Sequence, residues 1–385
     1  MTKKNYVSLH THTTFSIMDS TSTPEQMIDK AKELGMKALC FTEHGNIYSW
    51  IKKKQACDKA GIKYIHGIEL YMTESLTNKV RDNYHVILIA KNMKGTEEIN
   101  ELYTKATDEN HMYYNPRISF EEFLNTSDNI IRLSACLGGV LNRLDRNHPM
   151  YLDLLNKFDF LEVHPHIHPE QLAYNEYLGG IQKPLVACGD FHEVSQYKSE
   201  CRLKWMAGKG KKYGDEDAFD LVIKGYDEFR EMFIKQGVLS PEVIDTALEN
   251  TNKIADMVED FELDLTFKFP NLYDNPKELI RQKTFDSLDG LIADGLISES
   301  DIDIYIERIE TELHAFDVLN MESFILFMSE LMTFCMEENI AVGPARGSAS
   351  GSLVCYLLHV TDVDPIVWGT NFTRFINVNR ISLPD

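Results

Sequence analysis

The chain has 385 residues, with 39 Lys and Arg against 60 Asp and Glu, so its formal net charge at pH 7 is −21. A hydrophobic fraction of 43% with 26% charged residues is typical of a folded globular protein, and the length predicts two or three domains. The sequence has no apolar run near the ~18 residues of a membrane span and no apolar signal core after Met1. The acidic balance also argues against a chain that wraps a nucleic-acid backbone by itself.

Short apolar or β-branched runs alternate with amphipathic helical windows in the first half of the chain. One such helix is predicted over 25–34, opened by Thr23-Pro24 and stopped by Gly35. Because strands that alternate with helices are joined by helical crossovers, they are expected to be parallel, and seven of them suggest a closed or nearly closed α/β barrel. The predicted strands are 6–10, 38–42, 64–71, 86–90, 130–134, 158–163 and 185–188.

The strand signals fade from about residue 199, and helical spacing predicts helices over 243–258, 277–296 and 302–319. Ser240-Pro241 is a helix start of the same type as Thr23-Pro24. The segment 264–276, rich in Pro, Asp and Asn, indicates a linker, so we expect domains over 1–270 and 271–385. Seven scattered cysteines are typical of free thiols in a cytoplasmic protein.

Residue types that bind metals recur just past the predicted strands. His10 and His12 leave the first strand two residues apart, and their side chains therefore share a face. Because the carboxyl ends of barrel strands form one rim, loops distant in sequence converge there. Imidazole, carboxylate and thiolate suit zinc, and further carboxylates admit manganese or iron. Two or three such ions would neutralise a phosphate diester and activate a water. The other donors are Asp19 on the loop after the first strand, Glu43 and His44 at the end of the second, Glu69 within the third, Cys136 after the fifth, and Asp190 and His192 after the seventh.

Two further histidine groups have ordinary explanations. His164, His166 and His168 alternate after the sixth strand, but the prolines at 165 and 169 favour a solvated loop. His111 is expected to be structural. A single His-x-His would also be unremarkable, and it is the recurrence at several strand ends that favours a metal site.

Several motifs resemble the polymerase-and-histidinol-phosphatase (PHP) domain that begins bacterial DNA polymerase III alpha subunits. They are Leu9-His10-Thr11-His12, Ser16-Ile17-Met18-Asp19, Thr42-Glu43-His44-Gly45-Asn46, Gly67-Ile68-Glu69, Tyr84-His85-Val86, Leu133-Ser134-Ala135-Cys136, Leu161-Glu162-Val163 and Gly189-Asp190-Phe191-His192. The resemblance implies a distorted seven-stranded (β/α) barrel of the PHP type that holds two or three divalent ions, zinc, manganese or iron.

Carried over position by position, the metal ligands fall on nine residues, of which His85 rests on the resemblance alone. The nine are His10, His12, Asp19, His44, Glu69, His85, Cys136, Asp190 and His192. Glu43 stands where the family usually has aspartate and is taken as a neighbour of the site. The resemblance leaves open whether the domain is a 3′→5′ exonuclease or an inert scaffold.

A glycine- and serine-rich loop near the carboxyl terminus precedes a helix-like run at 353–359. Glycines let backbone N–H groups approach phosphate oxygens, and Arg346 could hold a phosphate in a bidentate way. By itself this pattern is weak, because a plain loop before a capped helix has the same composition.

The surroundings of this loop resemble the palm domain of the same alpha subunits. That palm is similar to the palm of polymerase beta, and the resemblance implies that this segment is mainly helical. The supporting motifs are Gly343-Pro344-Ala345-Arg346-Gly347-Ser348-Ala349-Ser350-Gly351-Ser352, Thr361-Asp362-Val363-Asp364-Pro365 and Asn379-Arg380-Ile381-Ser382-Leu383-Pro384-Asp385. The resemblance implies contacts with the nucleoside triphosphate and the primer terminus. The residues in question are Arg346, Gly347, Ser348, Gly351, Ser352, Arg374 and Arg380.

The resemblance places the polymerase's catalytic aspartates, which hold Mg²⁺, just beyond Asp385. We therefore expect this chain alone to be inactive as a polymerase until the carboxyl-terminal part completes it. A shortened gene product, a polymerase encoded in two pieces and the upstream flank of an intein are all compatible with this end.

The leading reading is the amino-terminal part of a replicative DNA-directed DNA polymerase, in the cytoplasm of a bacterium or of the host of a phage. Expected partners are primer–template DNA, deoxynucleoside triphosphates, the carboxyl-terminal part, the sliding clamp and other replisome subunits. The alternative is a free-standing metal-dependent PHP phosphoesterase, which would have no reason to carry residues 343–385.

Overall fold

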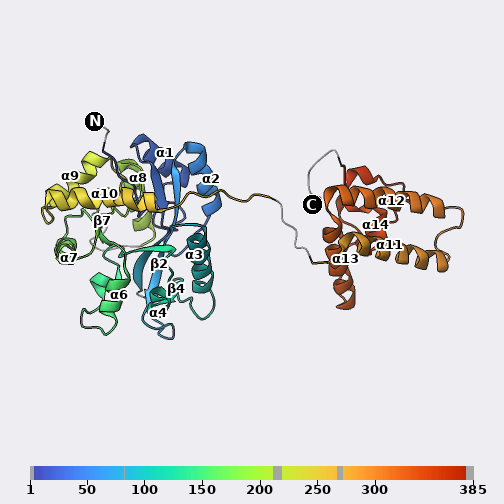
Figure 1. Cartoon of the computed structure of the whole chain (residues 1–385), viewed down its shortest axis with the longest axis horizontal. Helices are drawn as coiled ribbons and strands as arrows, with labels where there is room; N and C mark the ends of the chain where they lie inside the picture. The colour runs from blue at the N-terminus through green and yellow to red at the C-terminus, as the bar shows by residue number, and fades with distance from the viewer. Residues whose placement is uncertain (1–3, 82, 211–218, 267–271, 379–385) are drawn as a thin grey trace. The chain divides into compact units, whose positions relative to one another are not determined.

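The computed structural model describes residues 4–81, 83–210, 219–266 and 272–378. It contains two compact units, Met1–Leu263 and Asp264–Asp385, which are described separately (Figure 1). The predicted boundary between residues 270 and 271 lies outside the described residues.

The first unit is a mixed α/β barrel, as the sequence predicted. Its strands are β1 (Ala38–Phe41), β2 (Lys63–Thr73), β3 (Tyr84–Ala90), β4 (Arg117–Ser119), β5 (Ile130–Leu133), β6 (Leu161–Val163) and β7 (Leu185–Ala187). Its helices are α1 (Pro24–Glu33), α2 (Trp50–Ala60), α3 (Met93–Ala106), α4 (Phe120–Leu124), α5 (Val140–Arg143), α6 (Tyr151–Lys157), α7 (Pro169–Gly179), α8 (Gln196–Gly208), α9 (Tyr226–Gln236) and α10 (Pro241–Met257).

Backbone pairing closes these strands into a ring. The sheet runs β1-β2-β3-β5, and β6 pairs with β7. Isolated bridges complete the circle: Leu133 pairs with Phe160 before β6, Thr11 pairs with Phe191 after β7, and Ser8 pairs with Leu39 of β1. The predicted strand at 6–10 therefore occupies its place in the ring through single bridges.

Strand β3 departs from the prediction of parallel strands, since it is antiparallel to both β2 and β5. The described residues that join β2 to β3 contain no helix, so this connection lacks the crossover that parallel neighbours need. The short β4, which pairs with β2 outside the ring, was not predicted.

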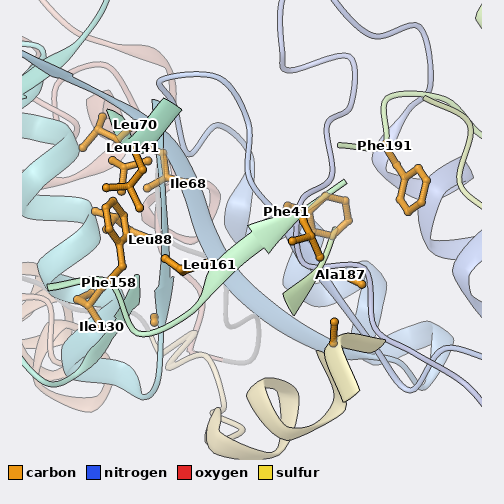
Figure 2. Close-up of a cluster of buried hydrophobic side chains, with 14 of the residues drawn as sticks. Phe41, Ile68, Leu70, Leu88, Ile130, Leu141, Phe158, Leu161, Ala187 and Phe191 are labelled. Atoms are coloured by element: carbon orange, nitrogen blue, oxygen red, sulfur yellow. The ribbon is translucent and has the colours of Figure 1, made fainter. Parts of the chain in front are cut away.

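Alternate residues of the strands form two separate apolar clusters, as the period of two requires. One face packs against the helices, and Figure 2 shows its side chains Ile68, Leu70 and Leu88 close together. The other face forms a smaller cluster that includes Cys40 and Ile87 and is closed by residues from the carboxyl-terminal end of α10. This second face also carries the polar residues of the site described below.

Helix starts follow the predicted signals. Thr23 accepts a hydrogen bond from the Gln26 N–H in a capping box before α1, and Ser240 caps α10. Gly35 has a φ of +79° just after α1, the left-handed conformation that glycine adopts without a steric cost.

Only the later part of the segment after β6 is the solvated loop that the sequence predicted, since Ile167 is 70% exposed and Pro169 is also exposed. His164 and His166 are buried. The side chain of Gln236 donates to the carbonyl oxygens of both, and the Asn175 amide donates to that of His164. These side-chain amides satisfy the loop's backbone inside the protein, a function that water would otherwise have to serve.

The second unit is mainly helical, as predicted. It contains α11 (Pro276–Ala293), α12 (Ile302–Leu319), α13 (Glu322–Glu337), the 3-10 turns η2 (Gly347–Gly351) and η3 (Phe372–Arg374), and α14 (Leu353–Leu357). Ile309, Phe316, Leu326 and Leu353 belong to its core.

Among the described residues, no single helix is long and apolar enough to cross a membrane. The pair α12 and α13 passes a test of length and composition only when the two helices are joined across a 114° bend.

Candidate metal centre

The donors predicted from the sequence converge at one end of the barrel. Glu69 follows Ile65 and Gly67 on the inward face of β2, and Asp190 follows Val186 and Cys188 beyond β7. His85 shares the face of Ile87, but it stands at the start of its strand. Because β3 runs antiparallel, its start lies at the end of the barrel where the parallel strands finish, which brings His85 to the site.

His10 and His12 face two carboxylates. His10 Nε2 lies 3.2 Å from Asp190 Oδ1 and 3.8 Å from Glu69 Oε1. His12 Nε2 lies 3.1 Å from the same Asp190 oxygen and 3.4 Å from Glu69 Oε2. Both imidazoles are completely buried. The two carboxylates therefore stand between the rings of the His-x-His pair.

A second group surrounds Asp19. Its Oδ2 atom lies 3.0 Å from His44 Nε2 and 3.4 Å from His192 Nε2. Its other carboxylate oxygen accepts from the guanidinium of Arg202, a residue of α8 that the sequence reading did not single out. His12, His44 and His192 form one set of ring nitrogens close enough to share an ion.

A third group joins Glu69, His85 and Cys136. His85 Nδ1 lies 2.6 Å from Glu69 Oε1 and 3.6 Å from the Cys136 sulfur. A Cβ at position 138 would meet the His85 ring at 2.9 Å, so the close approach of the ring requires Gly138. These three residues form another set that could hold an ion.

Several donor atoms at the centre of the site are buried without a hydrogen-bond partner. His44 Nδ1 and Glu69 Oε2 lie 2.5 Å apart as an ion pair, but their geometry is not that of a regular hydrogen bond. Nearly all buried polar atoms in proteins are paired, and a bound ion is one of the accepted reasons for an exception. The residues therefore fit bound metal ions. The atoms that lie in ion-pair contact but make no regular hydrogen bond are His10 Nε2, His12 Nε2, His44 Nδ1, Glu69 Oε2, Asp190 Oδ1 and His192 Nε2.

The other ring nitrogen of His10 and of His12, Nδ1, forms a hydrogen bond on the side of the ring away from the site. His10 Nδ1 donates to Glu162 Oε2 at 2.9 Å. His12 Nδ1 donates to the Ser16 hydroxyl at 2.8 Å, because that hydroxyl gives its own proton to Glu43 at 2.6 Å. Each ring is thereby fixed as the tautomer whose Nε2 lone pair points into the site.

Glu43 and Glu162 are therefore supporting residues. Glu43 is completely buried and also accepts from Lys53 Nζ at 2.7 Å. Glu162 is equally buried and accepts from His164 Nε2 at 3.2 Å. Sequence reasoning placed Glu43 beside the site but did not assign a role to Glu162. The only sequence signal for Glu162 is an acidic residue in the middle of an apolar strand.

The carboxylates remain ionised because imidazoles surround them. Burial would raise the pKa of Glu69, but His85 and His44 outweigh burial and hold it well below its usual value. Burial likewise opposes ionisation of Asp190, and His10 and His192 overcome it to lower the pKa. Burial, aided by His44 and His192, lowers the pKa of His12 to about 3, so this ring is neutral at pH 7. Burial would also lower the pKa of His10 and His44, but Asp190 and Glu162 raise that of His10, and Glu69 and Asp19 raise that of His44. Because metals bind neutral imidazole and ionised carboxylate, these two rings release a proton when an ion binds.

Backbone strain accumulates at the site. Met18, Ala135 and Asp190 have φ angles of 73°, 61° and 48°, a region that side chains other than glycine seldom occupy. The first two immediately precede Asp19 and Cys136, and the third is itself a predicted ligand. Strain of this kind persists where the surroundings force a side chain into place.

A cavity of about 830 Å³ opens onto these donors. Asp19, His44, His85, Cys136, Asp190 and His192 contribute to its lining. Arg81, Arg143 and Arg202 line it as well. Cations around a cleft in a chain with a net charge of −21 favour an anionic substrate at this place.

The glycine- and serine-rich loop of the second unit forms η2, followed by the single turn of α14. A Cβ at position 351 would lie 2.6 Å from the Asn371 carbonyl oxygen, so Gly351 is needed for close packing. The Ser352 hydroxyl is buried, donates to Glu312 Oε2 at 2.7 Å and accepts from the Cys355 N–H. Both residues thus serve the packing of the loop in this structure.

The remaining predicted phosphate contacts differ in exposure. Arg346, Gly347, Ser348 and Arg374 are exposed, and Gly347 has a φ of +51°. Glu312 occupies the amino-terminal end of α14, where its carboxylate accepts from the Leu353 and Val354 N–H groups. Arg380 lies outside the described residues.

Comparison with known families identifies both parts of the chain. Residues 8–164 match the PHP domain family, and residues 278–385 match the family described as the bacterial DNA polymerase III alpha NTPase domain. The resemblance predicted from the motifs is thereby confirmed.

The chain is also similar along its length to bacterial polymerase subunits. It is 32% identical to the DNA polymerase III subunit alpha of Borreliella burgdorferi over 410 positions, covering 100% of this chain and 35% of that protein. It is 32% identical to the Aquifex aeolicus subunit alpha over 421 positions, covering 99% of this chain and 36% of that protein. The chain thus spans about a third of the length of these relatives.

Among solved structures, the chain is similar to a Bifidobacterium adolescentis protein described as a metal-dependent phosphoesterase. The two are 17% identical, the match covers 60% of this chain and 97% of that one, and the TM-score is 0.35. A likeness at this level carries no weight for the chemistry of the site.

Proposed function

We propose that this chain, which joins a PHP domain to a segment of the bacterial DNA polymerase III alpha type, is the amino-terminal part of a replicative DNA polymerase whose PHP domain is a metal-dependent 3′→5′ exonuclease. The observation that carries the second half of the proposal is the set of buried imidazole and carboxylate atoms at the base of the cavity that make no regular hydrogen bond. The nine residues predicted from the sequence would hold two or three ions of zinc, manganese or iron.

Such ions supply charge neutralisation for a phosphate diester and a water acidic enough to attack phosphorus. The chain's own residues orient the side chains that would bind these ions. Glu162 and the Ser16–Glu43 pair hold the rings of His10 and His12 in the metal-binding tautomer. Arg202 fixes one oxygen of Asp19 and leaves the other turned toward His44 and His192.

The test is a cleavage assay on a 5′-labelled single-stranded oligonucleotide, with the protein stripped of metal and reloaded with zinc or manganese. We expect cleavage from the 3′ end in the reloaded protein and none in His12→Ala. Metal content measured on the same samples distinguishes the exonuclease from the inert scaffold, the two interpretations that the sequence left open. Bound metal without cleavage would contradict the exonuclease, and a wild-type protein that takes up no metal would support the inert scaffold.

The second unit supports the polymerase half of the proposal. Arg346, Gly347 and Ser348 are exposed and are the residues best placed to meet the triphosphate, with Arg374 as a further cation. Gly351 and Ser352 would act by holding that loop in shape. Mg²⁺, primer–template DNA, deoxynucleoside triphosphates, the sliding clamp and other replisome subunits belong to this proposal, as does a place in the cytoplasm.

Primer extension after mixing the chain with the carboxyl-terminal part of a related alpha subunit tests this half. We expect extension in the mixture and its loss with Arg346→Ala. Residues 278–385 favour this reading over a free-standing phosphoesterase, because they match a polymerase family. Cleavage of small phosphate esters with no DNA-dependent activity in the mixture would favour the phosphoesterase.

A further inference from the structure

The cavity above the metal donors has one apolar wall. Ile17 is 69% exposed, Tyr48 is 48% exposed and Met112 is 40% exposed, and all three line the same cavity. The base of the cavity is made of charged donors. Large apolar side chains held in water beside a polar base indicate a ligand that has an apolar part as well as a phosphate.

The aromatic members of the wall are fixed in place. The rings of Tyr48 and Tyr103, the latter from α3, meet edge to face with their centroids 6.3 Å apart. Burial and a hydrogen bond with the Tyr48 side chain raise the pKa of Tyr103, so the Tyr103 hydroxyl keeps its proton at neutral pH. A ring fixed through its edge and its hydroxyl still has a face that a ligand can cover.

A cation stands in the same cavity beside a further exposed ring. The Arg81 guanidinium lies 3.7 Å from the centre of the Tyr114 ring and donates to its hydroxyl. Arg81 also lines the cavity, and Tyr114 is 59% exposed. A guanidinium that lies against a ring and donates one N–H to its hydroxyl keeps other N–H groups for a phosphate oxygen.

We infer that Tyr48, with Ile17 and Met112, forms a base-stacking subsite for the terminal nucleoside of a single-stranded polynucleotide, while Arg81 contacts a neighbouring backbone phosphate. This inference rests on the proposed function, because it assumes that the scissile phosphate lies at the metal donors. Stacking of one base on an aromatic side chain contributes about 1–3 kcal/mol and tolerates every base. A small phosphate ester would use only the base of the cavity and none of this wall.

The test is a single-stranded oligodeoxynucleotide with 2-aminopurine as its 3′-terminal base, whose fluorescence is quenched when the base stacks. Binding is measured without added metal, so this readout does not depend on catalysis. We expect quenching with the wild-type protein, a loss of affinity of about tenfold in Tyr48→Ala, and retention in Tyr48→Phe. Tyr197→Ala is the matched control, because Tyr197 is 73% exposed on α8 and is outside the described lining of the cavity.

A small diester, bis(p-nitrophenyl) phosphate, separates this inference from the proposed function. We expect Tyr48→Ala to lower cleavage of the oligonucleotide about tenfold more than cleavage of the small diester. Equal losses on both substrates or unchanged quenching in Tyr48→Ala would overturn the stacking subsite. Failure of the reloaded wild-type protein to cleave either substrate would instead contradict the proposed function.

Discussion

The side chain of Glu162 has a single geometric purpose at the site, which is to orient His10. It is buried in β6, where a carboxylate is costly unless it is paired, and its Oε2 atom accepts from both His10 and His164. Burial would raise its pKa, but His10 and His164 lower it to about 2, so the group is ionised at neutral pH.

We predict that Glu162→Gln weakens metal binding by about 10- to 100-fold, the usual effect of removing a carboxylate behind a metal-binding histidine. Titration of the metal-free protein with Co²⁺, followed by its absorption, measures the change. Glu122→Gln is the control, since Glu122 pairs with His111 at 3.0 Å in the same unit but away from the site. If Glu162 acts through His10, adding Glu162→Gln to His10→Ala causes no further loss, and an additive loss would contradict this role.

Lys53 and Glu43 form a second buried pair, at 2% and 1% exposure. We predict that Lys53→Met destabilises the metal-free protein at pH 7 by about 3–5 kcal/mol, because it leaves a buried carboxylate without its cation. Lys54→Met should cost less than about 1 kcal/mol, since its partner Asp58 is half exposed. Denaturant unfolding of the two variants makes the comparison.

The pH dependence of the Lys53→Met effect follows from the same pair. Burial opposes ionisation of Glu43, but Lys53 and His12 lower its pKa to about 2. A carboxyl with a lowered pKa contributes stability above its unfolded-state value of about 4.3, and this stability disappears as the pH falls toward 2. The difference between wild type and Lys53→Met should therefore shrink between about pH 4.3 and pH 2. A difference that stays constant over this window would contradict the assignment.

The sequence predicted individual residues well wherever a strand ends in a donor. The sequence did not predict the environment of residues whose contacts come from segments far away in the chain. His164 and His166 were expected in a solvated loop, but Gln236, some seventy positions away, satisfies their carbonyl oxygens. Nothing local in the sequence indicates that contact. The predicted roles of the nine donors as metal ligands stay predictions, although the structure places their side chains together.

At the scale of elements, β3 shows that hydrophobic periodicity predicts the position of a strand but not its direction. The pattern of apolar residues located this strand, but the same pattern fits a strand running in either direction. Direction is set by the connection, and the one between β2 and β3 has no crossover helix among its described residues. The reversed direction explains why His85 is found at the start of its strand, while donors such as Cys136 and Asp190 follow theirs.

In the second unit, the contact between η2 and η3 is the contact between elements that a single substitution would disturb most. We predict that Gly351→Ala destabilises this unit by about 1–3 kcal/mol, because the new Cβ would meet the Asn371 carbonyl oxygen, a backbone atom that cannot turn aside. Gly343→Ala is the control, since nothing lies within 4 Å of a Cβ at that position. Hydrogen exchange measured over 272–378 is the readout, and equal protection in the two variants would contradict the packing argument.

At the scale of the whole molecule, the chain consists of two units with separate cores. The predicted metal ligands all belong to the first unit, and the glycine- and serine-rich loop belongs to the second. The boundary that the sequence predicted at residue 270, in the Pro- and Asp-rich segment 264–276, stays a prediction. The sequence could not specify how the donors at the rim pair with one another.

Metal should therefore stabilise one unit and leave the other unchanged. A ligand that binds only the native state raises stability by RT ln(1 + [L]/Kd), about 4 kcal/mol when the free ion exceeds its dissociation constant a thousandfold. We predict that zinc or manganese raises the unfolding temperature of the first unit and slows hydrogen exchange in β2, β3 and β7, while exchange in α11 to α14 stays the same. His12→Ala should reduce the stabilisation, and Arg346→Ala should not alter it. Equal stabilisation of both units by the ion would mean that the metal binds elsewhere or couples the two cores, and the assignment of the centre to the barrel rim would then be wrong.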